Sequence, residues 1–342
     1  MAYTTIDDPT IYFNTKLYTG TGSSNALTGI NFQPDWVWIK RRNSAGGNMI
    51  TDVIRGVTKT IITNETGAEQ TFSNGLTAFG SDGFTVGSED GFNKASDTFV
   101  AWNWKAGGSA SSNSNGSITS SVSANTTAGF SIGTYNGSGS DNTVGHGLGV
   151  APDMIFVKCK STAHDWVVYH SALGNAKILT LNASTAAQSA TGWQSTSPTS
   201  SVFSIDNAAN SLNQSGQSFV FYAMASKKGY SKFGSYTGNG NADGTFVYTG
   251  FKPAWVLYKK SSGTENWFLH DNKRQGFNPD NELLFADLSN AEGTVNRIDL
   301  LSNGFKARTS DGGINGSGAT YIYMAFAESP FVTSTGIPTT AR

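Results

Sequence analysis

Short apolar runs, separated by turns rich in glycine, serine and asparagine, dominate the hydrophobic pattern of this chain. Residues 36–39 and 219–225 are typical runs, and polar residues with a turn follow each of them. Runs of this length and composition are typical of β-strands. No stretch longer than about ten residues keeps the 3.6-residue period of an amphipathic helix. The pattern therefore predicts an all-β protein with few helices.

The same pattern occurs three times along the chain. Three blocks recur in one order: a tyrosine–glycine block beginning at Tyr18, Tyr135 and Tyr236, a block opened by Pro34, Pro152 and Pro253, and a closing apolar block beginning at Phe99, Phe219 and Tyr321. The first and second copies lie 117–120 residues apart, and the second and third lie 101–102 apart. Such constant spacing predicts three tandem modules.

Each module holds roughly six to eight short strands, which is the size of a two-sheet antiparallel β-sandwich. We expect sandwich modules at residues 16–108, 129–229 and 230–330, a flexible Gly/Ser/Asn-rich linker at 109–128, and terminal segments at 1–15 and 331–342.

Charge and hydropathy exclude several functional classes. Lys plus Arg is 23 against Asp plus Glu at 24, and only 14% of the 342 residues are charged. This balance provides no general field that would draw the protein to nucleic acid or to an anionic membrane. The longest apolar run, residues 219–225, is far shorter than the about twenty residues that a membrane helix needs. No signal peptide is recognisable at the start, so we expect synthesis in a cytoplasm, with no nucleic-acid partner and no membrane insertion.

The sequence contains no recognisable reaction centre. Cys159 has no His or acid at a suggestive spacing and is interpreted as an ordinary strand residue. His146, His164, His170 and His270 form no paired metal-ligand motif, and no phosphate-binding glycine loop occurs. We therefore predict no catalytic residue, no cofactor, no metal site and no enzymatic activity.

Oxygen-rich loops precede each closing block, at residues 89–96, 206–216 and 311–318. Asp, Asn and Gly in such loops serve tight turns, and the same residues can ligate calcium. The turn interpretation is favoured because the EF-hand spacing is missing, and weak calcium binding stays open.

Tryptophans are the remaining candidates for ligand contacts. Trp193 lies in a polar segment without an obvious counterpart in the other modules, and Trp166 and Trp267 lie at equivalent places in modules two and three. An exposed indole can stack on the apolar face of a sugar ring. We name Trp193, Trp166 and Trp267 as candidate ligand-binding residues, although a simple surface-packing role is favoured for Trp193.

The repeated blocks resemble a module of unknown function from tailed bacteriophages, especially marine ones. The residues that carry the resemblance are Tyr236-Thr237-Gly238-Asn239-Gly240, the strand from Gly250 to Val256, the ending from Tyr321 to Ala327, and the entry from Ser123 to Phe130. Modules of this kind are common in predicted tail-fibre and other virion proteins. The resemblance implies a lectin-like, concanavalin-like jelly-roll fold and a place on a virus particle, and it carries no catalytic residues.

The resemblance and the composition together predict a virion protein of the tail-fibre or receptor-binding type, assembled in the host cytoplasm. Its expected partners are other virion proteins, a host surface polysaccharide and two further copies in a homotrimer. The N-terminal segment, with Tyr3, Ile6, Ile11, Tyr12 and Phe13, is expected to dock the protein to the particle, and residues 331–342 are a second docking candidate.

Two alternatives stay open. A decoration protein of the head, or a subunit of the tail or collar, would have no receptor function, and the chain has no fibrous stalk that would argue against this. A polysaccharide depolymerase is the weaker alternative, because no pair of carboxylates recurs at matched positions.

Overall fold

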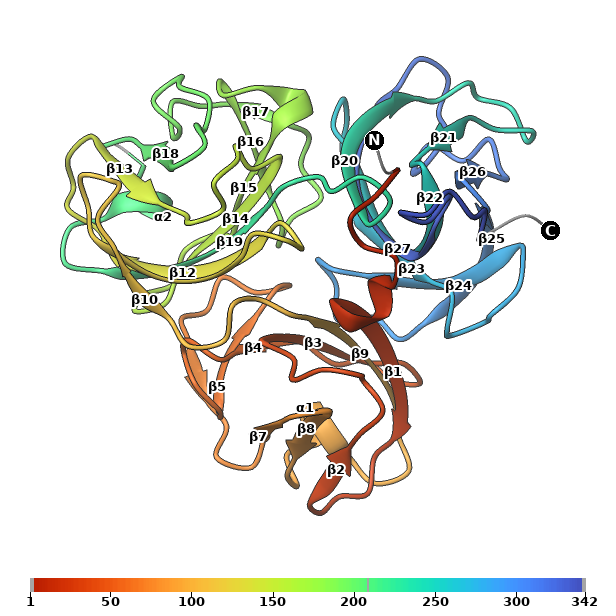
Figure 1. Ribbon diagram of the computed structural model, residues 1–342, viewed down its shortest axis with the longest axis horizontal. Helices are drawn as coiled ribbons and strands as arrows, with labels where there is room; N and C mark the ends of the chain where they lie inside the picture. The colour runs from red at the N-terminus through yellow and green to blue at the C-terminus, as the bar shows by residue number, and fades with distance from the viewer. Residues whose placement is uncertain (1–2, 208, 340–342) are drawn as a thin grey trace.

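The computed structural model describes residues 3–207 and 209–339, apart from the side chains of residues 280 and 281, and it is all-β as predicted. Helical structure in this part of the chain is limited to single turns, α1 (Asp90–Asn93), α2 (Asn210–Asn213), η1 (Pro9–Ile11) and η2 (Ser171–Leu173). The strands form three lobes around a common centre (Figure 1). No helix in the described chain has the length and apolar character that crossing a membrane requires.

Lobe 1 consists of β1–β9. Its main sheet has the order β1-β9-β3-β4-β5-β6, and a small sheet has the order β2-β8-β7. The strands are β1 (Phe13–Thr19), β2 (Asn25–Leu27), β3 (Trp36–Arg41), β4 (Asn48–Asp52), β5 (Lys59–Ile62), β6 (Gln70–Thr71), β7 (Leu76–Gly80), β8 (Gly83–Val86) and β9 (Thr98–Trp104).

Lobe 2 consists of β10–β19. Its main sheet has the order β10-β11-β12-β19-β14-β15-β16-β17, and β13 pairs with β18 separately. The strands are β10 (Ser111–Asn113), β11 (Ser120–Asn125), β12 (Phe130–Asn136), β13 (Asn142–Gly145), β14 (Met154–Cys159), β15 (Val167–His170), β16 (Lys177–Thr180), β17 (Gln188–Ser189), β18 (Val202–Ile205) and β19 (Ser218–Met224).

Lobe 3 consists of β20–β27, which join in one sheet of order β20-β27-β22-β23-β24-β25-β26-β21. The strands are β20 (Ser231–Thr237), β21 (Phe246–Tyr248), β22 (Phe251–Lys260), β23 (Trp267–Asp271), β24 (Asp280–Phe285), β25 (Gly293–Leu301), β26 (Gly304–Ala307) and β27 (Thr320–Pro330).

The segment that was predicted to be a flexible linker is part of lobe 2. Strands β10 and β11 extend the main sheet, with Ser111 opposite Val122 and Val122 opposite Gly133. The expectation failed because serine and asparagine need no core of their own when their backbone pairs with an existing sheet edge. Val122 also reaches the lobe-2 core, where it is 5% exposed.

The central strand of each main sheet is buried on both faces, which explains its unbroken apolar sequence. In β3, Trp36 and Trp38 face the centre of the molecule, whereas Val37 and Ile39 face the core of lobe 1. Strands β14 and β22 divide their side chains between the centre and their own lobe cores in the same way. The two-residue period of a strand thus supplies four cores, one inside each lobe and one shared by all three.

The shared core, which we call the hub, is an aromatic cluster with contributions from every lobe. The Trp36 ring stacks on Tyr222 of lobe 2, with ring centroids 4.8 Å apart. The Trp104 ring meets Trp255 of lobe 3 edge to face at 5.4 Å. Trp36, Tyr222, Trp104 and Trp255 are all 0% exposed, so the hub excludes solvent from the centre.

Equivalent backbone hydrogen bonds join the lobes in a closed ring. The Glu69 amide donates to the Lys160 carbonyl, the Ala187 amide donates to the Ser261 carbonyl, and the Glu292 amide donates to the Arg42 carbonyl, over 2.9, 2.9 and 2.7 Å. Each lobe therefore donates to the next, and lobe 3 donates back to lobe 1. This is the head-to-tail arrangement of a cyclic trimer, here formed within one chain.

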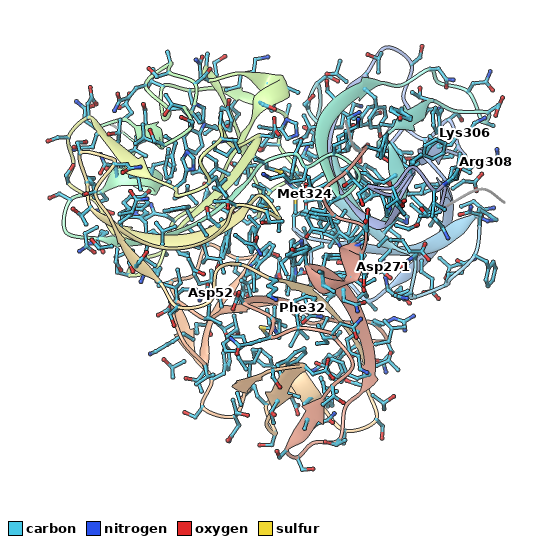
Figure 2. The ribbon with its side chains drawn as sticks, viewed as in Figure 1. Phe32, Asp52, Asp271, Lys306, Arg308 and Met324 are labelled. Atoms are coloured by element: carbon cyan, nitrogen blue, oxygen red, sulfur yellow. The ribbon has the colours of Figure 1, made fainter. Side chains whose placement is uncertain are left out.

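We call the contact between two neighbouring lobes a joint. At each joint lies the polar residue that ends β4, β15 or β23, the strands that pair with the central strands β3, β14 and β22. Asp52 accepts a 2.7 Å hydrogen bond from the Tyr222 hydroxyl of lobe 2, and Asp271 accepts a 3.0 Å bond from Trp102 Nε1 of lobe 1. At the third joint, Met324 stands where the donor would be. Figure 2 shows Asp52, Asp271 and Met324 where neighbouring lobes meet.

Methionine donates no hydrogen bond, so the third joint has a different hydrogen bond, in which lobe 2 supplies the donor and lobe 3 the acceptor. His170 occupies the position of the two aspartates, and its Nδ1 accepts from the Ala172 amide at 3.1 Å. The proton therefore lies on Nε2, which donates to the Tyr323 carbonyl of lobe 3 at 3.3 Å. Burial lowers the pKa of His170 from its ordinary 6.5 to about 4.

The His170→Asn variant tests this joint by its dependence on pH. Because the folded pKa is the lower one, the unfolded chain binds the proton first, and stability is fully present above pH 6.5 and falls as the pH drops toward 4. Between pH 6.5 and 4 we expect the free energy of unfolding of the wild type to fall by up to about 3 kcal/mol more than that of His170→Asn. Asparagine keeps a hydrogen-bond acceptor and does not titrate. Urea unfolding at several pH values measures the difference, and parallel pH profiles of the two proteins would contradict the prediction.

Candidate functional site

One hairpin of lobe 3 departs from the repeated plan. Ile50 pairs with Ile61 in lobe 1 and Val168 pairs with Leu179 in lobe 2, each 11 positions on, whereas Leu269 of lobe 3 pairs with Leu284, 15 positions on. The longer hairpin carries Phe277, which is 70% exposed. One exposed apolar side chain is common on protein surfaces, so the surroundings of Phe277 decide whether it can contact a ligand.

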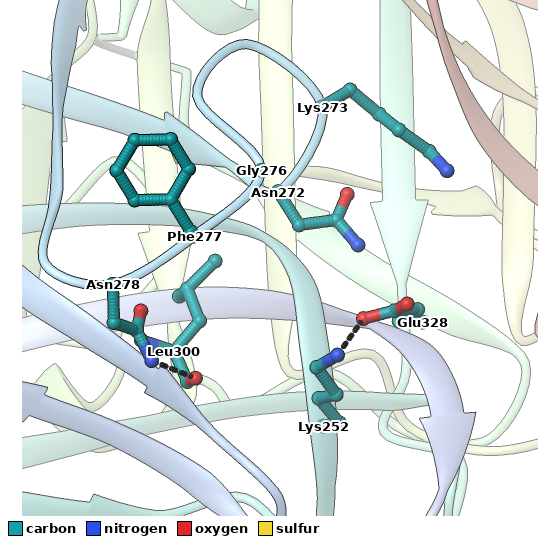
Figure 3. A pocket seen from close by; sticks show the side chains of 8 residues that line it. All are labelled: Lys252, Asn272, Lys273, Gly276, Phe277, Asn278, Leu300 and Glu328. Atoms are coloured by element: carbon teal, nitrogen blue, oxygen red, sulfur yellow. Dashed lines mark hydrogen bonds and ion pairs between the residues drawn. The ribbon is translucent and has the colours of Figure 1, made fainter.

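Phe277 is one of the residues that line a pocket of about 370 Å³ (Figure 3). The lining combines this aromatic ring with two amide side chains, Asn272 and Asn278, and with charged side chains. Lys252 and Glu328, from the neighbouring strands β22 and β27, form an ion pair at one side of the pocket, with Nζ and Oε2 2.7 Å apart. An aromatic face beside amides and both signs of charge is suited to a hydroxylated ligand, because the ring covers apolar C–H groups while the polar groups bind hydroxyls.

Asn278 holds the Phe277 loop against strand β25. Its Nδ2 donates to the Leu300 carbonyl at 2.8 Å, and its Oδ1 accepts from the Leu300 amide at 2.9 Å. The two bonds pair one side-chain amide with one backbone residue, so the loop is fixed to the sheet directly next to the exposed ring.

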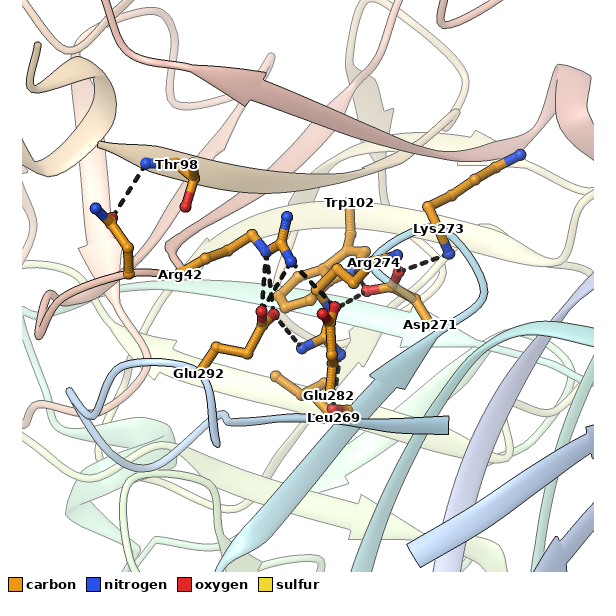
Figure 4. Close-up of polar contacts among 10 residues, drawn as sticks. Arg42, Thr98, Trp102, Leu269, Asp271, Lys273, Arg274, Glu282 and Glu292 are labelled. Atoms are coloured by element: carbon orange, nitrogen blue, oxygen red, sulfur yellow. Dashed lines mark hydrogen bonds and ion pairs between the residues drawn. The ribbon is translucent and has the colours of Figure 1, made fainter. Parts of the chain in front are cut away.

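The base of the loop is fixed by Asp271 and Arg274, which are fully buried (Figure 4). Arg274 Nε donates to Asp271 Oδ2 at 2.6 Å, and Arg274 Nη2 donates to the Leu269 carbonyl at 2.9 Å. Burial alone would raise the pKa of Asp271, but the adjacent Arg274 guanidinium and the Trp102 indole hold it below its usual value. The carboxylate is therefore charged and joins the loop to lobe 1.

A second layer of charges continues this network to the surface of the joint. Glu292 accepts from Arg274 Nη1 at 2.9 Å and from Arg42 of lobe 1 at 2.8 Å, and Arg42 also reaches Glu282 at 3.0 Å. Burial and the charge of Glu292 raise the pKa of Glu282. Because both glutamates face arginines, we interpret the cluster as a support for the joint and not as an acid–base pair.

The three tryptophans named as ligand-binding candidates are not available to a ligand. Trp166 and Trp267 are 0% exposed, and Trp193 is 1% exposed. The indoles of Trp166 and Trp267 donate across joints, to the Ile62 and Thr180 carbonyls. The prediction of a stacking surface at these residues was wrong, because each indole packs in a core that residues distant in sequence complete.

Trp193 was misinterpreted because its neighbours in sequence are polar. In the fold its ring packs edge to face on Tyr169, with centroids 5.6 Å apart, and on Phe203 at 6.3 Å. Trp193 therefore belongs to the lobe-2 core, and the surface-packing role that the sequence favoured for it was wrong.

Most of the predicted docking segment is part of the fold. Ile6 is 3% exposed and Phe13 is 2% exposed, and the Phe13 ring lies 4.9 Å from Trp104 and 5.3 Å from Phe326. Tyr12 is half-buried against the hub, and the Tyr3 hydroxyl donates to the Gly250 carbonyl at 2.6 Å. Only Ile11, at 40% exposed, offers an accessible apolar side chain among the five. The segment packs between lobe 1 and lobe 3, so the expectation that it lies outside the modules and docks the protein was wrong for its buried residues. Residues 1, 2 and 340–342 lie outside the described chain.

Buried asparagines occupy the oxygen-rich loops that were considered for calcium. Asn93, Asn213 and Asn315 are 0% exposed, and each accepts a backbone amide of the tyrosine–glycine loop of its lobe, from Thr21, Ser138 and Asn239. These side chains are held in loop hydrogen bonds, as the turn interpretation expects. Among the residues that the structure describes, no group of three or more His, Cys, Asp or Glu side chains is placed to hold a metal ion.

Each central strand carries one fully buried lysine, Lys40, Lys158 or Lys259. Lys40 donates to the Leu288 carbonyl of lobe 3 at 2.9 Å, and Lys158 donates to the Thr66 carbonyl of lobe 1 at 2.8 Å. Burial lowers the pKa of Lys40 to about 7 and those of Lys158 and Lys259 to about 8. The Leu288 and Thr66 carbonyls belong to neighbouring lobes, so we assign Lys40 and Lys158 to the joints, whereas Lys259 donates to the Lys260 carbonyl of its own strand at 2.6 Å.

Comparison with known proteins shows that one family model covers all three lobes. The model of a family described as "Domain of unknown function (DUF7483)" matches residues 8–330, which span all three lobes. No curated protein matches the chain.

The network below the Phe277 loop predicts a large effect of one substitution. Asp271→Ala removes the acceptor of Arg274 Nε and of the Trp102 indole and leaves Glu292 as the remaining carboxylate on the buried guanidinium, so we expect a loss of about 3 kcal/mol in the free energy of unfolding. Asp243→Ala is the matched control, because Asp243 pairs with Lys306 on the surface and its side chain is 77% exposed. Chemical denaturation measures both, and equal midpoints for the two variants would contradict the assigned role of Asp271.

Proposed function

For this chain, which belongs to the DUF7483 family, we propose a role as a bacteriophage virion structural protein of the tail-fibre or receptor-binding type. In this proposal the lobes form a rigid head whose outer loops contact host surface glycans. The observation that carries the glycan contact is the Phe277 pocket, because it is built on a hairpin that is longer than its two counterparts.

The repeated architecture supports the assignment to a virion. We infer that the three lobes are tandem copies of one jelly-roll-type β-sandwich module, since their strands follow the same sequence blocks and their joints use equivalent bonds. A ring closed by buried joints suits a particle that must keep its shape outside a cell. The virion location rests on the resemblance of these blocks to phage modules.

The contacts between the lobes hold the Phe277 loop in a fixed conformation. The loop is fixed to β25 by Asn278 and to lobe 1 by Asp271, so the exposed ring is held in place before a ligand arrives. A pre-formed site loses less conformational entropy on binding than a mobile loop does. The proposed homotrimer of whole chains would add avidity to sites that are individually weak.

A second candidate function is a decoration, tail or collar protein without receptor binding. The burial of Ile6 and Phe13 favours it, because these residues were expected to dock a fibre to the particle and instead hold the lobes together. Such a subunit would attach through the outer surface of the lobes.

The location on the particle separates the two candidates. Antibody labelling of intact particles, imaged by electron microscopy, is expected to place this protein at tail or fibre tips. Label spread over the capsid would contradict the receptor-binding proposal and favour decoration, and particles without label would contradict both.

The glycan contact predicts a specific effect of Phe277→Ala. Loss of the stacking ring should weaken binding to an array of bacterial surface polysaccharides by about tenfold, because an exposed aromatic contact contributes on the order of 1 kcal/mol or more. Phe246→Ala is the matched control, since Phe246 is an exposed aromatic residue of the same lobe at 43% exposure. Wild-type binding that both variants retain in full would contradict a role of this pocket.

A further inference from the structure

Lobe 2 contains a cleft of about 370 Å³ that opens between strands β15, β16 and β17 and the α2 turn. Its floor is aliphatic, with Val167, Ile178 and Leu212, and its rim carries the polar side chains Asp165, Gln188 and Asn210. This cleft shares no residue with the Phe277 pocket. Its origin is visible when the equivalent positions of the three lobes are compared.

In lobe 3, large side chains occupy the equivalent place. The register that pairs Val167 with Thr180 in lobe 2 pairs Phe268 with Phe285 in lobe 3, and these two rings touch with centroids 5.4 Å apart. Arg297 covers Phe268, with its guanidinium carbon 4.6 Å from the ring centroid. Two phenyl rings and a guanidinium thus fill in lobe 3 what is open in lobe 2.

The position of Arg297 corresponds to a glycine in lobe 2. The residue after β26, Arg308, donates its amide to the Arg297 carbonyl at 2.7 Å, and the residue after β18, Asp206, donates to the Gly192 carbonyl at 3.0 Å. Where lobe 3 projects an arginine over the sheet, lobe 2 therefore has only a hydrogen atom.

Lobe 1 also has a glycine there, and its neighbours close the space. A Cβ on Gly75 would lie 2.9 Å from the Phe92 ring and 3.0 Å from Phe72 Cβ, and the Phe72 and Phe92 rings are 5.9 Å apart. Met49, the counterpart of Val167, extends to the α1 turn, where a Cβ on Gly91 would lie 2.4 Å from its Cε. Aromatic and thioether groups therefore fill lobe 1.

Gly192 of lobe 2 faces the cleft directly. A Cβ at this position would lie 3.0 Å from Leu212 Cδ1, 3.8 Å from Ala209 Cβ and 3.9 Å from Ile178 Cγ2, all of which line the cleft. The smaller residues Val167, Thr180 and Gly192 together leave a space of the volume that ligand pockets have.

The lining indicates the chemical class of the ligand. Amide and hydroxyl groups surround the rim, Asp165 contributes a carboxylate, and the described lining holds no lysine or arginine that would favour an anion. The floor is branched aliphatic and not aromatic, so it accommodates a methyl group better than the flat face of a sugar ring.

We propose that this cleft binds a neutral sugar that carries a methyl substituent, an N-acetyl group or the methyl of a 6-deoxy sugar, with the methyl on the aliphatic floor and the hydroxyls at the amide rim. The site is additional to the Phe277 pocket and holds whether or not the lobe-3 pocket binds glycan. It makes lobe 2 the sugar-selective lobe of the ring.

The test is titration of the full chain with N-acetylglucosamine and fucose, followed by NMR, with glucose and galactose as sugars that lack the methyl group. We expect amide shifts at Thr191 and Ser211 with the methyl-bearing sugars and at least tenfold weaker binding of the other two. Absence of shifts with both methyl-bearing sugars, or equal binding of glucose and N-acetylglucosamine, would overturn the proposal.

Two variants locate the sugar. Gly192→Val fills the cleft and should weaken binding at least tenfold, whereas Gly293→Val should leave it unchanged, because a Cβ on Gly293 meets nothing within 4 Å. Asn210→Ala removes a rim amide without filling the cleft and should weaken binding about fivefold, the value of one neutral hydrogen bond. Full binding by both Gly192→Val and Asn210→Ala would overturn the assignment to this cleft. Phe277→Ala should bind these monosaccharides as the wild type does, so failure of the lobe-3 proposal is distinguishable from failure of this one.

Discussion

The packing of three sheets on one shared aromatic core is the constraint on which the rest of this structure depends. The central strand of each lobe is buried on both faces. Its own lobe covers one face, so the other two lobes must cover the second. The hub provides that cover, with Trp36, Tyr222 and Trp255 from three different lobes, all without exposed surface. A lobe alone would expose a tryptophan- and methionine-rich face to water, which soluble proteins avoid. Each lobe therefore depends on the other two, although each has a core of its own.

Closure of the ring also explains where the three lobes have diverged. The joints are held to one plan by equivalent bonds, such as those that Glu69, Ala187 and Glu292 donate to the next lobe. The lobes differ elsewhere: lobe 3 carries a longer hairpin with Phe277, which starts at the Asp271 joint, and lobe 2 has Gly192 in place of a large side chain. Surface loops and cleft linings can differ between lobes while the hub residues stay buried.

The all-β character could be predicted from the sequence, since strands depend on local patterns of apolar and turn residues. What the sequence did not reveal depends on contacts between distant residues. Trp193 lies among polar neighbours, and only the approach of Tyr169 and Phe203 makes it a core residue. The sequence predicts that Phe13 belongs to a docking segment, because its partners, Trp104 and Phe326, lie in two other segments of the chain. A comparison of the spacings between the three lobes points to both candidate sites. The hairpin after Leu269 is four residues longer than its counterparts, and Gly192 aligns with Arg297.

The central claim is that the hub makes the three lobes one cooperative unit, and differential scanning calorimetry of the full chain tests it most directly. If the lobes depend on the shared core, the chain unfolds in one transition whose calorimetric enthalpy equals the van't Hoff enthalpy. A calorimetric enthalpy about three times the van't Hoff value, or separate transitions for separate lobes, would mean that each lobe is stable alone and would contradict the account.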